Sequence, residues 1–373
     1  MKVCAVIMAG GVGTRFWPYS REARPKQLLD VLHNGKSLLE LTIERTKTFA
    51  ELANTLIITN KSHIEGVKAQ TPGLPAENII AEPIGRNTAP AIALAAKIAK
   101  ERLGEDAVMV VLPADHMIKN DHEFTRLIEI GMRLASITKG LITLGIHPTR
   151  PETGYGYIQL DDERLPSSAT LPGFTEFELR DIFCAHRFAE KPDKETAERF
   201  VESGIFLWNS GMFIWRVDAI EEALRTYTEG IMEHIDVLSA EGNADFTKKL
   251  NDVYSKIRGV SIDYAVMERA KNVYVLRASA LGWSDLGSWD EVWRLSEKDL
   301  NNNVIEQSKD IVVRNSKGNL VFSKSKELIV LNGVNDLVVV DSGDAILITH
   351  RDKAQSVKDI TDYLKRNSRN EYL

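Results

Sequence analysis

Residues 8–26, MAGGVGTRFWPYSREARPK, combine three glycines with several cations in a pattern that suits phosphate binding. They follow a short apolar run, residues 3–7, which is typical of a buried strand. Glycines at positions 10, 11 and 13 let a ligand approach the main chain, and the N–H groups of such a turn can form an anion site. Arg15 and Lys26 add positive charge beside it. The pattern predicts a loop that holds a polyphosphate; the alternative is a simple tight connection after the first strand.

Two better-known glycine motifs do not fit this loop. No Gly-Lys-Ser or Gly-Lys-Thr follows the glycines, so the P-loop pattern fails. Phe16 stands where the dinucleotide fingerprint needs its third glycine. The loop is therefore neither of these two phosphate-binding turns.

Two aspartates are candidate metal ligands. Asp115 follows the apolar run 108–112, and Asp285 lies in the segment GWSDLGSW, residues 282–289. Mg²⁺ binds carboxylate oxygens together with substrate phosphates, so the pair could hold one ion that also contacts an α-phosphate. The spacing leaves open whether the two meet, and a helix cap or turn is the alternative for each. We expect His116, beside Asp115, to be structural.

Strands and helices alternate through the first 145 residues. The patterns predict strands over 3–7, 56–59, 79–81, 108–112 and 141–144, and helices from 38, over 62–70 and 89–103, and from a cap at Asp121 to 137. Ser37 and Glu40 have capping-box spacing. Such alternation indicates βαβ units and a mostly parallel sheet, whose ligands bind outside the carboxyl ends of the strands. The glycine loop and residues 113–116 both lie at such ends.

In the second half of the chain, strands and helices no longer alternate regularly. Residues 154–157, 183–190 and 205–215 are hairpin-like, 217–250 are helical, and 273–277 predict a strand. The polar stretch 296–303, SEKDLNNN, is a plausible linker. Short β-type runs follow over 304–348, without a repeat of fixed period, and a last helix covers 354–366. We therefore expect two domains, residues 1–295 and 304–373.

The amino-acid composition indicates which kinds of partner and which cellular compartment to expect. The 373 residues are 43% hydrophobic and 27% charged, and the formal net charge of −6 argues against a nucleic-acid partner. Cys4 and Cys184 are too few for a disulfide framework, which fits a reducing cytosol. No apolar run approaches the roughly 18 residues that span a bilayer, and the run after Lys2 is too short for a signal peptide. We expect a cytoplasmic protein without a membrane partner. The exposed strand edges of the tail favour a homodimer.

Several motifs in fixed order carry a resemblance to a known family. GGVGTR and RPKQL are followed by PADH, ETGYGY, FAEKP, WNSGMF and WSDLGSW. Together they resemble the sugar-1-phosphate nucleotidyltransferases, and among them the mannose-1-phosphate guanylyltransferases. The similarity covers residues 2–292, and the tail resembles the partial β-helix of that family. It implies an α/β fold with a Rossmann-like, GT-A-like mixed sheet that is mostly parallel, and a small β-helix-like domain. Longer relatives add a phosphomannose isomerase domain, for which this chain has no room, so it resembles a monofunctional enzyme.

The resemblance also implies roles for individual residues. Arg15, Lys26, Asp115 and Asp285 would be catalytic, and the two aspartates would bind Mg²⁺. GTP would be held at its triphosphate and its base by Ala9, Gly10, Gly11, Gly13, Thr14, Arg15, Lys26, Glu82, Pro83, Arg86, Asn87, Thr88 and Ala89. Mannose 1-phosphate would be held by Gly154, Tyr155, Glu190, Lys191, Asn209 and Asp285.

The implied reaction is an in-line attack of the mannose 1-phosphate oxygen on the α-phosphorus of GTP. A phosphate oxygen is already an anionic nucleophile at neutral pH, so positioning and charge neutralisation suffice. One alternative is the same chemistry with another base or sugar. The other is a catalytically silent subunit that senses sugar nucleotides. Such a subunit would be expected to have lost Lys26, Asp115 or Asp285, and this chain keeps all three.

Overall fold

The fold is built on one nine-stranded mixed sheet with strand order β3-β2-β1-β4-β8-β5-β9-β7-β6. The computed structural model describes residues 1–161, 167, 171–238, 246–306 and 310–373. The strands are β1 (Val3–Ala9), β2 (Thr55–Asn60), β3 (Ile79–Glu82), β4 (Val108–Pro113), β5 (Leu141–Ile146), β6 (Gly156–Asp161), β7 (Ile182–Glu190), β8 (Phe206–Arg216) and β9 (Val273–Arg277). The first four are mutually parallel, as predicted. β8 lies antiparallel between β4 and β5 near the centre, a position that the sequence did not indicate.

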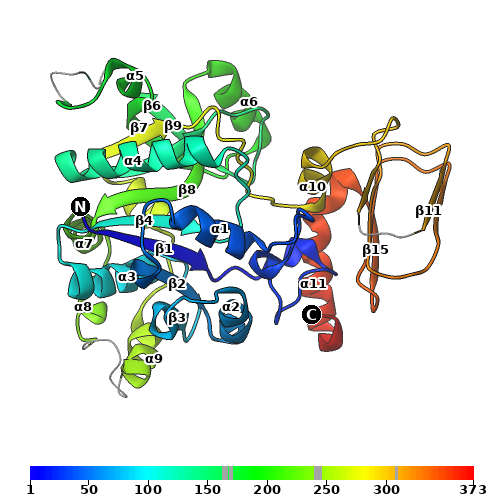
Figure 1. Ribbon diagram of the computed structural model, residues 1–373, viewed down its shortest axis with the longest axis horizontal. Helices are drawn as coiled ribbons and strands as arrows, with labels where there is room; N and C mark the ends of the chain where they lie inside the picture. Colours follow the sequence, from blue (N-terminus) through cyan, green and yellow to red (C-terminus); the bar gives the residue numbers. More distant parts are fainter. Residues whose placement is uncertain (162–166, 168–170, 239–245, 307–309) are drawn as a thin grey trace.

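Helices cover both faces of this sheet (Figure 1). On one face pack α3 (Thr88–Leu103), α7 (Val217–Tyr227), α8 (Ile231–Ile235) and α9 (Phe246–Lys256). On the other face pack α1 (Leu38–Thr46), α2 (Ile64–Gln70) and α4 (Asp121–Thr138). Two further helices, α5 (Glu176–Leu179) and α6 (Lys194–Ser203), lie in the connections between the antiparallel strands β6, β7 and β8. Among the described residues, no helix combines the length and apolar composition needed to cross a membrane.

Two local predictions for the helices can be compared with the structure. The capping box of Ser37 and Glu40 is present at the start of α1. The cap predicted at Asp121 is wrong: Asn120 caps α4, and its side chain accepts from the Glu123 N–H at 3.1 Å. The N-cap lies one residue earlier than predicted, so Asp121 is the first residue of α4 and its carboxylate pairs with Arg45 at 2.8 Å. The helical stretch predicted over 217–250 is α7, α8 and α9, with 239–245 outside the described residues.

The C-terminal segment forms two small sheets that face each other. One contains β10 (Val304–Glu306), β12 (Leu320–Ser323), β14 (Leu337–Asp341) and β15 (Ile346–His350); the other pairs β11 (Ile311–Arg314) with β13 (Ile329–Asn332). In two of the parallel pairs, β11 with β13 and β12 with β14, the offset is 18 residues. This offset is the coil of a β-helix. Because each coil contains two strands, the apolar runs recur at about half that interval. The third parallel pair, β10 with β12, is offset by 16 residues, so the spacing is not uniform, in agreement with the absence of a fixed period in the sequence.

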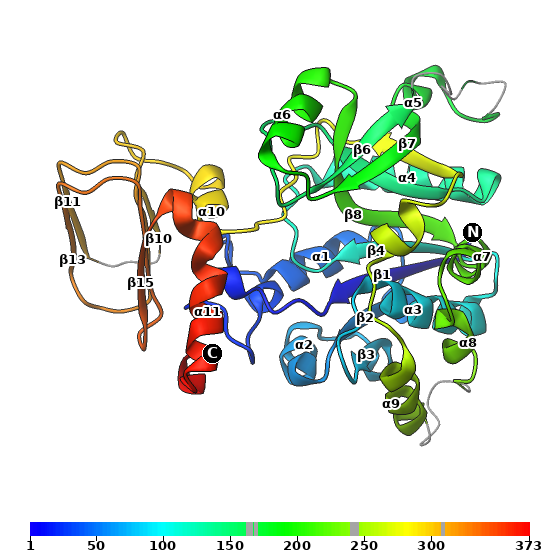
Figure 2. The ribbon, with the colours of Figure 1, turned by 180° about the vertical axis from the view of Figure 1, so that it is seen from behind.

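The β-helix is fastened to the glycine-loop end of the large sheet. Phe16 and Trp17, just after the loop, share one buried core with Trp289 of α10 (Trp289–Leu295), with Phe322 of β12 and with Val357. Val357 begins α11 (Val357–Arg366), the helix that lies between the β-helix and the sheet (Figures 1 and 2). The two units therefore share a core at the end of the sheet where the predicted site lies.

Candidate active site

Two cavities lie beyond the carboxyl ends of β1 and β4, and both are lined by His116 and Asp285. The main cavity, of about 480 Å³, contains Gly10 and Gly11 of the predicted triphosphate set, together with residues predicted to bind the base and the sugar: Glu82, Asn87, Thr88, Gly154, Tyr155, Glu190 and Asn209. The loop cavity, of about 330 Å³, contains Gly13, Thr14, Arg15, Lys26 and Asp115. The fold thus brings most of the predicted site residues to one place.

The glycine loop turns its carbonyl groups toward the protein. Gln27 Nε2 donates to the carbonyl oxygens of Ala9 and Gly11 at 2.8 and 2.9 Å. The N–H groups of Gly11, Val12 and Gly13 donate to no group in the described part of the chain. Unpaired N–H groups in a turn form an anion site. The loop therefore presents donors, and not acceptors, to a ligand.

Gly13 allows Lys26 to pack directly against this loop. Its φ is 68°, and a Cβ there would lie 2.4 Å from the Cβ of Lys26, so no other residue fits without rearrangement. Lys26 is only 5% exposed. Its Nζ donates to the carbonyl oxygen of Asp285 at 2.6 Å and pairs with the Asp115 carboxylate at 2.7 Å. This ammonium joins the two loops that carry the predicted metal ligands.

The two aspartates line the same cavity because their loops pair. Met117 and Ser284 exchange two backbone hydrogen bonds of 2.8 and 3.0 Å. Desolvation raises the pKa of Asp115, but the ammonium of Lys26 and its hydrogen bond outweigh this effect and hold that pKa below its ordinary value. Among the described residues, no group of three or more His, Cys, Asp and Glu side chains could hold a metal ion. Two carboxylates alone leave most positions of a hard cation to substrate oxygens and water, which is the arrangement typical of Mg²⁺ in phosphate chemistry.

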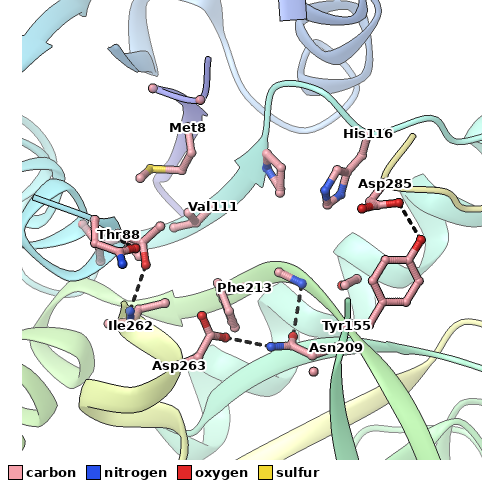
Figure 3. A pocket seen from close by; sticks show the side chains of 18 of the residues that line it. Met8, Thr88, Val111, His116, Tyr155, Asn209, Phe213, Ile262, Asp263 and Asp285 are labelled. Carbon is pink, nitrogen blue, oxygen red and sulfur yellow. Dashed lines mark hydrogen bonds between the residues drawn. The ribbon is translucent and has the colours of Figure 1, made fainter. Parts of the chain in front are cut away.

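Tyr155 orients the second of these carboxylates. Its hydroxyl donates a short hydrogen bond to Asp285 Oδ1 (Figure 3). Burial, together with the charge of Asp285, raises the pKa of Tyr155, so the phenol stays protonated as a donor. The Tyr155 ring packs edge-on against Trp208 and Trp283, with centroids 5.0 and 5.4 Å away. Asp285 does not cap α10, whose N-cap is Ser288.

His116 lies between the two cavities and is held by its ring nitrogens. Its Nδ1 accepts from the indole N–H of Trp283 at 3.1 Å, so the proton of the neutral ring is on Nε2, which faces Asp115 at 3.9 Å. Burial lowers the pKa of His116 and keeps it neutral, although Asp115 acts in the opposite direction. These contacts suit the structural role expected from the sequence.

One wall of the main cavity is made by the end of β3 and the start of α3. Asn87 caps α3 and accepts from the Thr88 N–H at 2.9 Å, and Thr88 Oγ1 accepts from the Ile262 N–H at 2.8 Å (Figure 3). Glu82 is 6% exposed, and its Oε1 has no hydrogen-bond partner among the described groups. Burial raises the pKa of Glu82 from 4.5 to about 7. A buried carboxyl with an unused oxygen is suited to accept hydrogen bonds from a ligand.

The opposite wall carries a polar cluster around Asn209. Its Nδ2 donates to Asp263 at 2.7 Å, and its Oδ1 accepts from the Gly211 N–H at 3.1 Å (Figure 3). Burial, reinforced by the charge of Glu190, raises the pKa of Asp263. The amide and two carboxyl groups offer acceptors and a donor for hydroxyl groups. Asp263 was not predicted, and the only signal was an acidic residue inside the apolar segment SIDYAVM.

Five predicted residues, all within the described chain, lie outside the lining of both cavities. The Arg86 guanidinium donates to the Tyr254 carbonyl at 3.0 Å and so ties its loop to α9. Lys191 is 62% exposed and pairs with Glu190 at 2.7 Å. The other three are Ala9, Pro83 and Ala89. Their ligand contacts stay predictions.

Comparisons with known proteins agree with this geometry. Residues 4–302 match the nucleotidyl transferase family, and residues 309–364 match the MannoseP isomerase/GMP-like β-helix domain. The chain belongs to the nucleotidyl transferase family. A mannose-1-phosphate guanylyltransferase of Salmonella muenchen is 41% identical over all of this chain and 75% of its own length, and one of Escherichia coli is 40% identical over 98% and 75%. The resemblance to the mannose-1-phosphate guanylyltransferases is thereby confirmed.

A solved structure extends the likeness to the whole fold. The crystal structure of mannose-1-phosphate geranyltransferase from Thermus thermophilus is 32% identical, with a TM-score of 0.82. It covers 98% of this chain, and this chain covers all of it. The α/β sheet and the β-helix-like tail expected from the sequence are both confirmed.

Proposed function

We propose that this chain transfers GMP from GTP to α-D-mannose 1-phosphate and forms GDP-mannose and pyrophosphate. The observation that carries the proposal is the junction of the two cavities at His116 and Asp285. The cations Arg15 and Lys26 line the loop cavity on one side of this junction, and base and sugar walls line the main cavity on the other, while the glycine loop contributes to both. Relatives about 40% identical over almost the full chain are guanylyltransferases of the same substrate.

Asp115 and Asp285 would hold Mg²⁺ in this proposal. Their carboxylate oxygens are hard donors, line the same cavity and leave coordination positions for phosphate oxygens, so they fit the ion. The ion would neutralise charge on the α-phosphate and orient it. Tyr155 fixes the direction of the Asp285 carboxylate, and Lys26 holds the two aspartate loops at a constant separation.

The reaction itself needs no general base. An oxygen of mannose 1-phosphate forms a bond to the α-phosphorus of GTP while the bond to the α–β bridging oxygen breaks, and its electron pair leaves with pyrophosphate. The attacking oxygen is already anionic, so the side chains need only position the two substrates and neutralise the negative charge of their phosphates. Arg15 and Lys26 lie on the pyrophosphate side, and Lys191 would reach the sugar phosphate by releasing Glu190.

The walls of the main cavity supply specificity. Guanine offers an N–H and an NH₂ on one edge, which match the Glu82 carboxyl group, whose Oε1 has no partner among the described groups. On the opposite wall, Glu190, Asn209 and Asp263 would bind mannose hydroxyls. A sugar that lacks one of these hydroxyls should bind more weakly, because a polar group of the wall is then left without a hydrogen-bond partner.

The direct test is pyrophosphate release in the presence of Mg²⁺, with GTP, ATP, UTP and dTTP each combined with mannose 1-phosphate or glucose 1-phosphate. We expect strong release only with GTP and mannose 1-phosphate. Release with another pair would keep the mechanism but contradict the roles of Glu82 and the Asn209 wall. If folded protein released pyrophosphate with no pair, the alternative of a sensing subunit would replace this proposal.

A homodimer is the assembly that the β-helix supports best. Apolar side chains on its edge strands are exposed, among them Val330 of β13 and Ile346 and Ile348 of β15, which are 53%, 63% and 66% exposed. Edge strands with apolar side chains favour pairing with another chain. Light scattering should show a dimer for the unaltered chain and a monomer for Ile348→Lys. The cytoplasmic location expected from the low cysteine content stays a prediction.

A further inference from the structure

The loop cavity receives one cation from outside the large sheet. Lys358, in the first turn of α11, lines this cavity together with Arg15 and Lys26, although no motif in the sequence pointed to it. In the described part of the chain, neither Lys358 nor Arg15 forms an ion pair with an acidic side chain, whereas Lys26 is paired with Asp115. Two cations are therefore available to an anion in this cavity.

Packing fixes the position of Lys358. The preceding residue, Val357, is fully buried in the core that contains Phe16 and Trp17. The Trp17 indole donates to the carbonyl oxygen of Tyr372 at 2.7 Å, which ties the end of the chain to the glycine loop. Both ribbon views show α11 beside the blue segment that follows β1 (Figures 1 and 2). The backbone of Lys358 cannot move away from the loop without opening this core.

The arrangement of the two cavities indicates which phosphates Lys358 would meet. Under the proposed function, on which this inference rests, the base and the sugar occupy the main cavity, and the α-phosphorus lies at the junction marked by His116 and Asp285. The rest of the triphosphate then extends into the loop cavity. We infer that Lys358 binds the β- and γ-phosphates of GTP and so stabilises the departing pyrophosphate.

This role assigns the β-helix unit a part in the reaction. The leaving pyrophosphate gains the electron pair of the broken α–β bridge, and its added negative charge develops where Arg15 and Lys358 lie. Cations aimed at developing charge lower the barrier more than they strengthen substrate binding. In the reverse direction, the same cations bind pyrophosphate as the attacking group.

The test compares Lys358→Ala with Lys353→Ala, because Lys353 is an exposed lysine of the preceding 3₁₀ segment (Arg351–Ser356) that lines neither cavity. Titration calorimetry with pyrophosphate in the presence of Mg²⁺ measures the leaving-group site directly. We expect Lys358→Ala to weaken pyrophosphate binding about three- to ten-fold, as for an exposed charge that becomes partly desolvated by its ligand. Lys358→Arg should retain most of the affinity, and GDP-mannose should bind all variants equally.

Two results would overturn the inference. One is unchanged pyrophosphate affinity in Lys358→Ala, and the other is an equal loss in Lys353→Ala, which would indicate only a general surface charge. A parallel loss of GDP-mannose affinity would contradict the assignment to the leaving group. The titration stays decisive even if GTP and mannose 1-phosphate prove to be the wrong substrates, because every nucleoside triphosphate releases pyrophosphate in this reaction. Failure of the proposed function would appear instead as a lack of turnover in the unaltered protein.

Discussion

Substituting Glu82 should change how guanine-nucleotide affinity depends on pH. Burial raises the pKa of this carboxyl from 4.5 to about 7, and its Oε1 has no partner among the described groups. The N–H groups of guanine bind an ionised carboxylate much more strongly than a protonated carboxyl group, which carries a donor of its own. A raised pKa means that the acceptor form is lost as the pH falls through about 7, so affinity should fall in the same direction. Glu82→Gln removes the titration and should bind more weakly at pH 8.

The size of the effect follows from the ionised fraction. With a pKa of about 7, roughly one-eleventh of the Glu82 carboxyl is ionised at pH 6 and roughly ten-elevenths at pH 8. Because apparent affinity scales with the competent fraction, affinity should rise about ten-fold between these values, or about 1.4 kcal/mol. Binding should also release roughly 0.9 proton at pH 6 and roughly 0.5 at pH 7.

Titration calorimetry with GDP-mannose at pH 6, 7 and 8 measures both quantities, if it is repeated in buffers of different ionisation enthalpy. GDP-mannose is preferable to GTP because its diphosphate diester does not titrate in this range. Glu77→Gln is the matched control, since Glu77 is exposed and lies outside the cavity. The reasoning is refuted if unaltered protein shows no pH dependence. An equal slope in Glu82→Gln would refute it as well and direct attention to Asp263, a second carboxyl of the main cavity whose pKa is raised.

The remaining predictions concern the metal ligands and the sugar wall. Asp115→Asn and Asp285→Asn should each lower turnover about 100-fold or more with unchanged circular dichroism; near-normal rates at saturating Mg²⁺ would remove that residue from the metal site. Lys191→Ala should raise the KM for mannose 1-phosphate about ten-fold, and an unchanged KM would contradict its role. Asp263→Ala should also raise this KM several-fold while leaving that for GTP unchanged, because the amide of Asn209 loses its acceptor. Equal effects on both substrates would indicate a general loss of structure.

The first half of the fold could be predicted because its signals are local. Each strand from β1 to β5 is a short apolar run, and each helix between them has its own periodicity and start signal. The place of β8 depends instead on pairing with β4 and β5, which are far away in the sequence. Nothing within residues 206–216 specifies a central antiparallel position. The 18-residue coil of the β-helix could not be read from the sequence for a related reason, since it appears only when alternate strands are compared.

The candidate site also contains residues that local motifs could predict and residues that only tertiary contacts bring together. Motifs of contiguous residues placed the glycine loop and Asp115 correctly at one edge of the sheet, because strand ends are local features. Asp285 lines the same cavity as Asp115 because of the bridge between Met117 and Ser284, which no spacing encodes. No motif in the sequence pointed to Lys358. It is one exposed lysine among many, and only tertiary packing brings it to the loop cavity.

Lys26 shows why one residue can serve two purposes in this site. A buried ammonium is stable only when its protons are satisfied, and Lys26 meets the Asp115 carboxylate at 2.7 Å and the carbonyl oxygens of Asp285 and Leu286 at 2.6 and 3.2 Å. Its removal would therefore separate the metal-ligand loops as well as delete a charge near the phosphates. Arg15 is exposed and lacks an ion pair within the described chain, so its substitution changes charge alone. Comparing the two substitutions separates electrostatic stabilisation of the triphosphate from the positioning of the carboxylates.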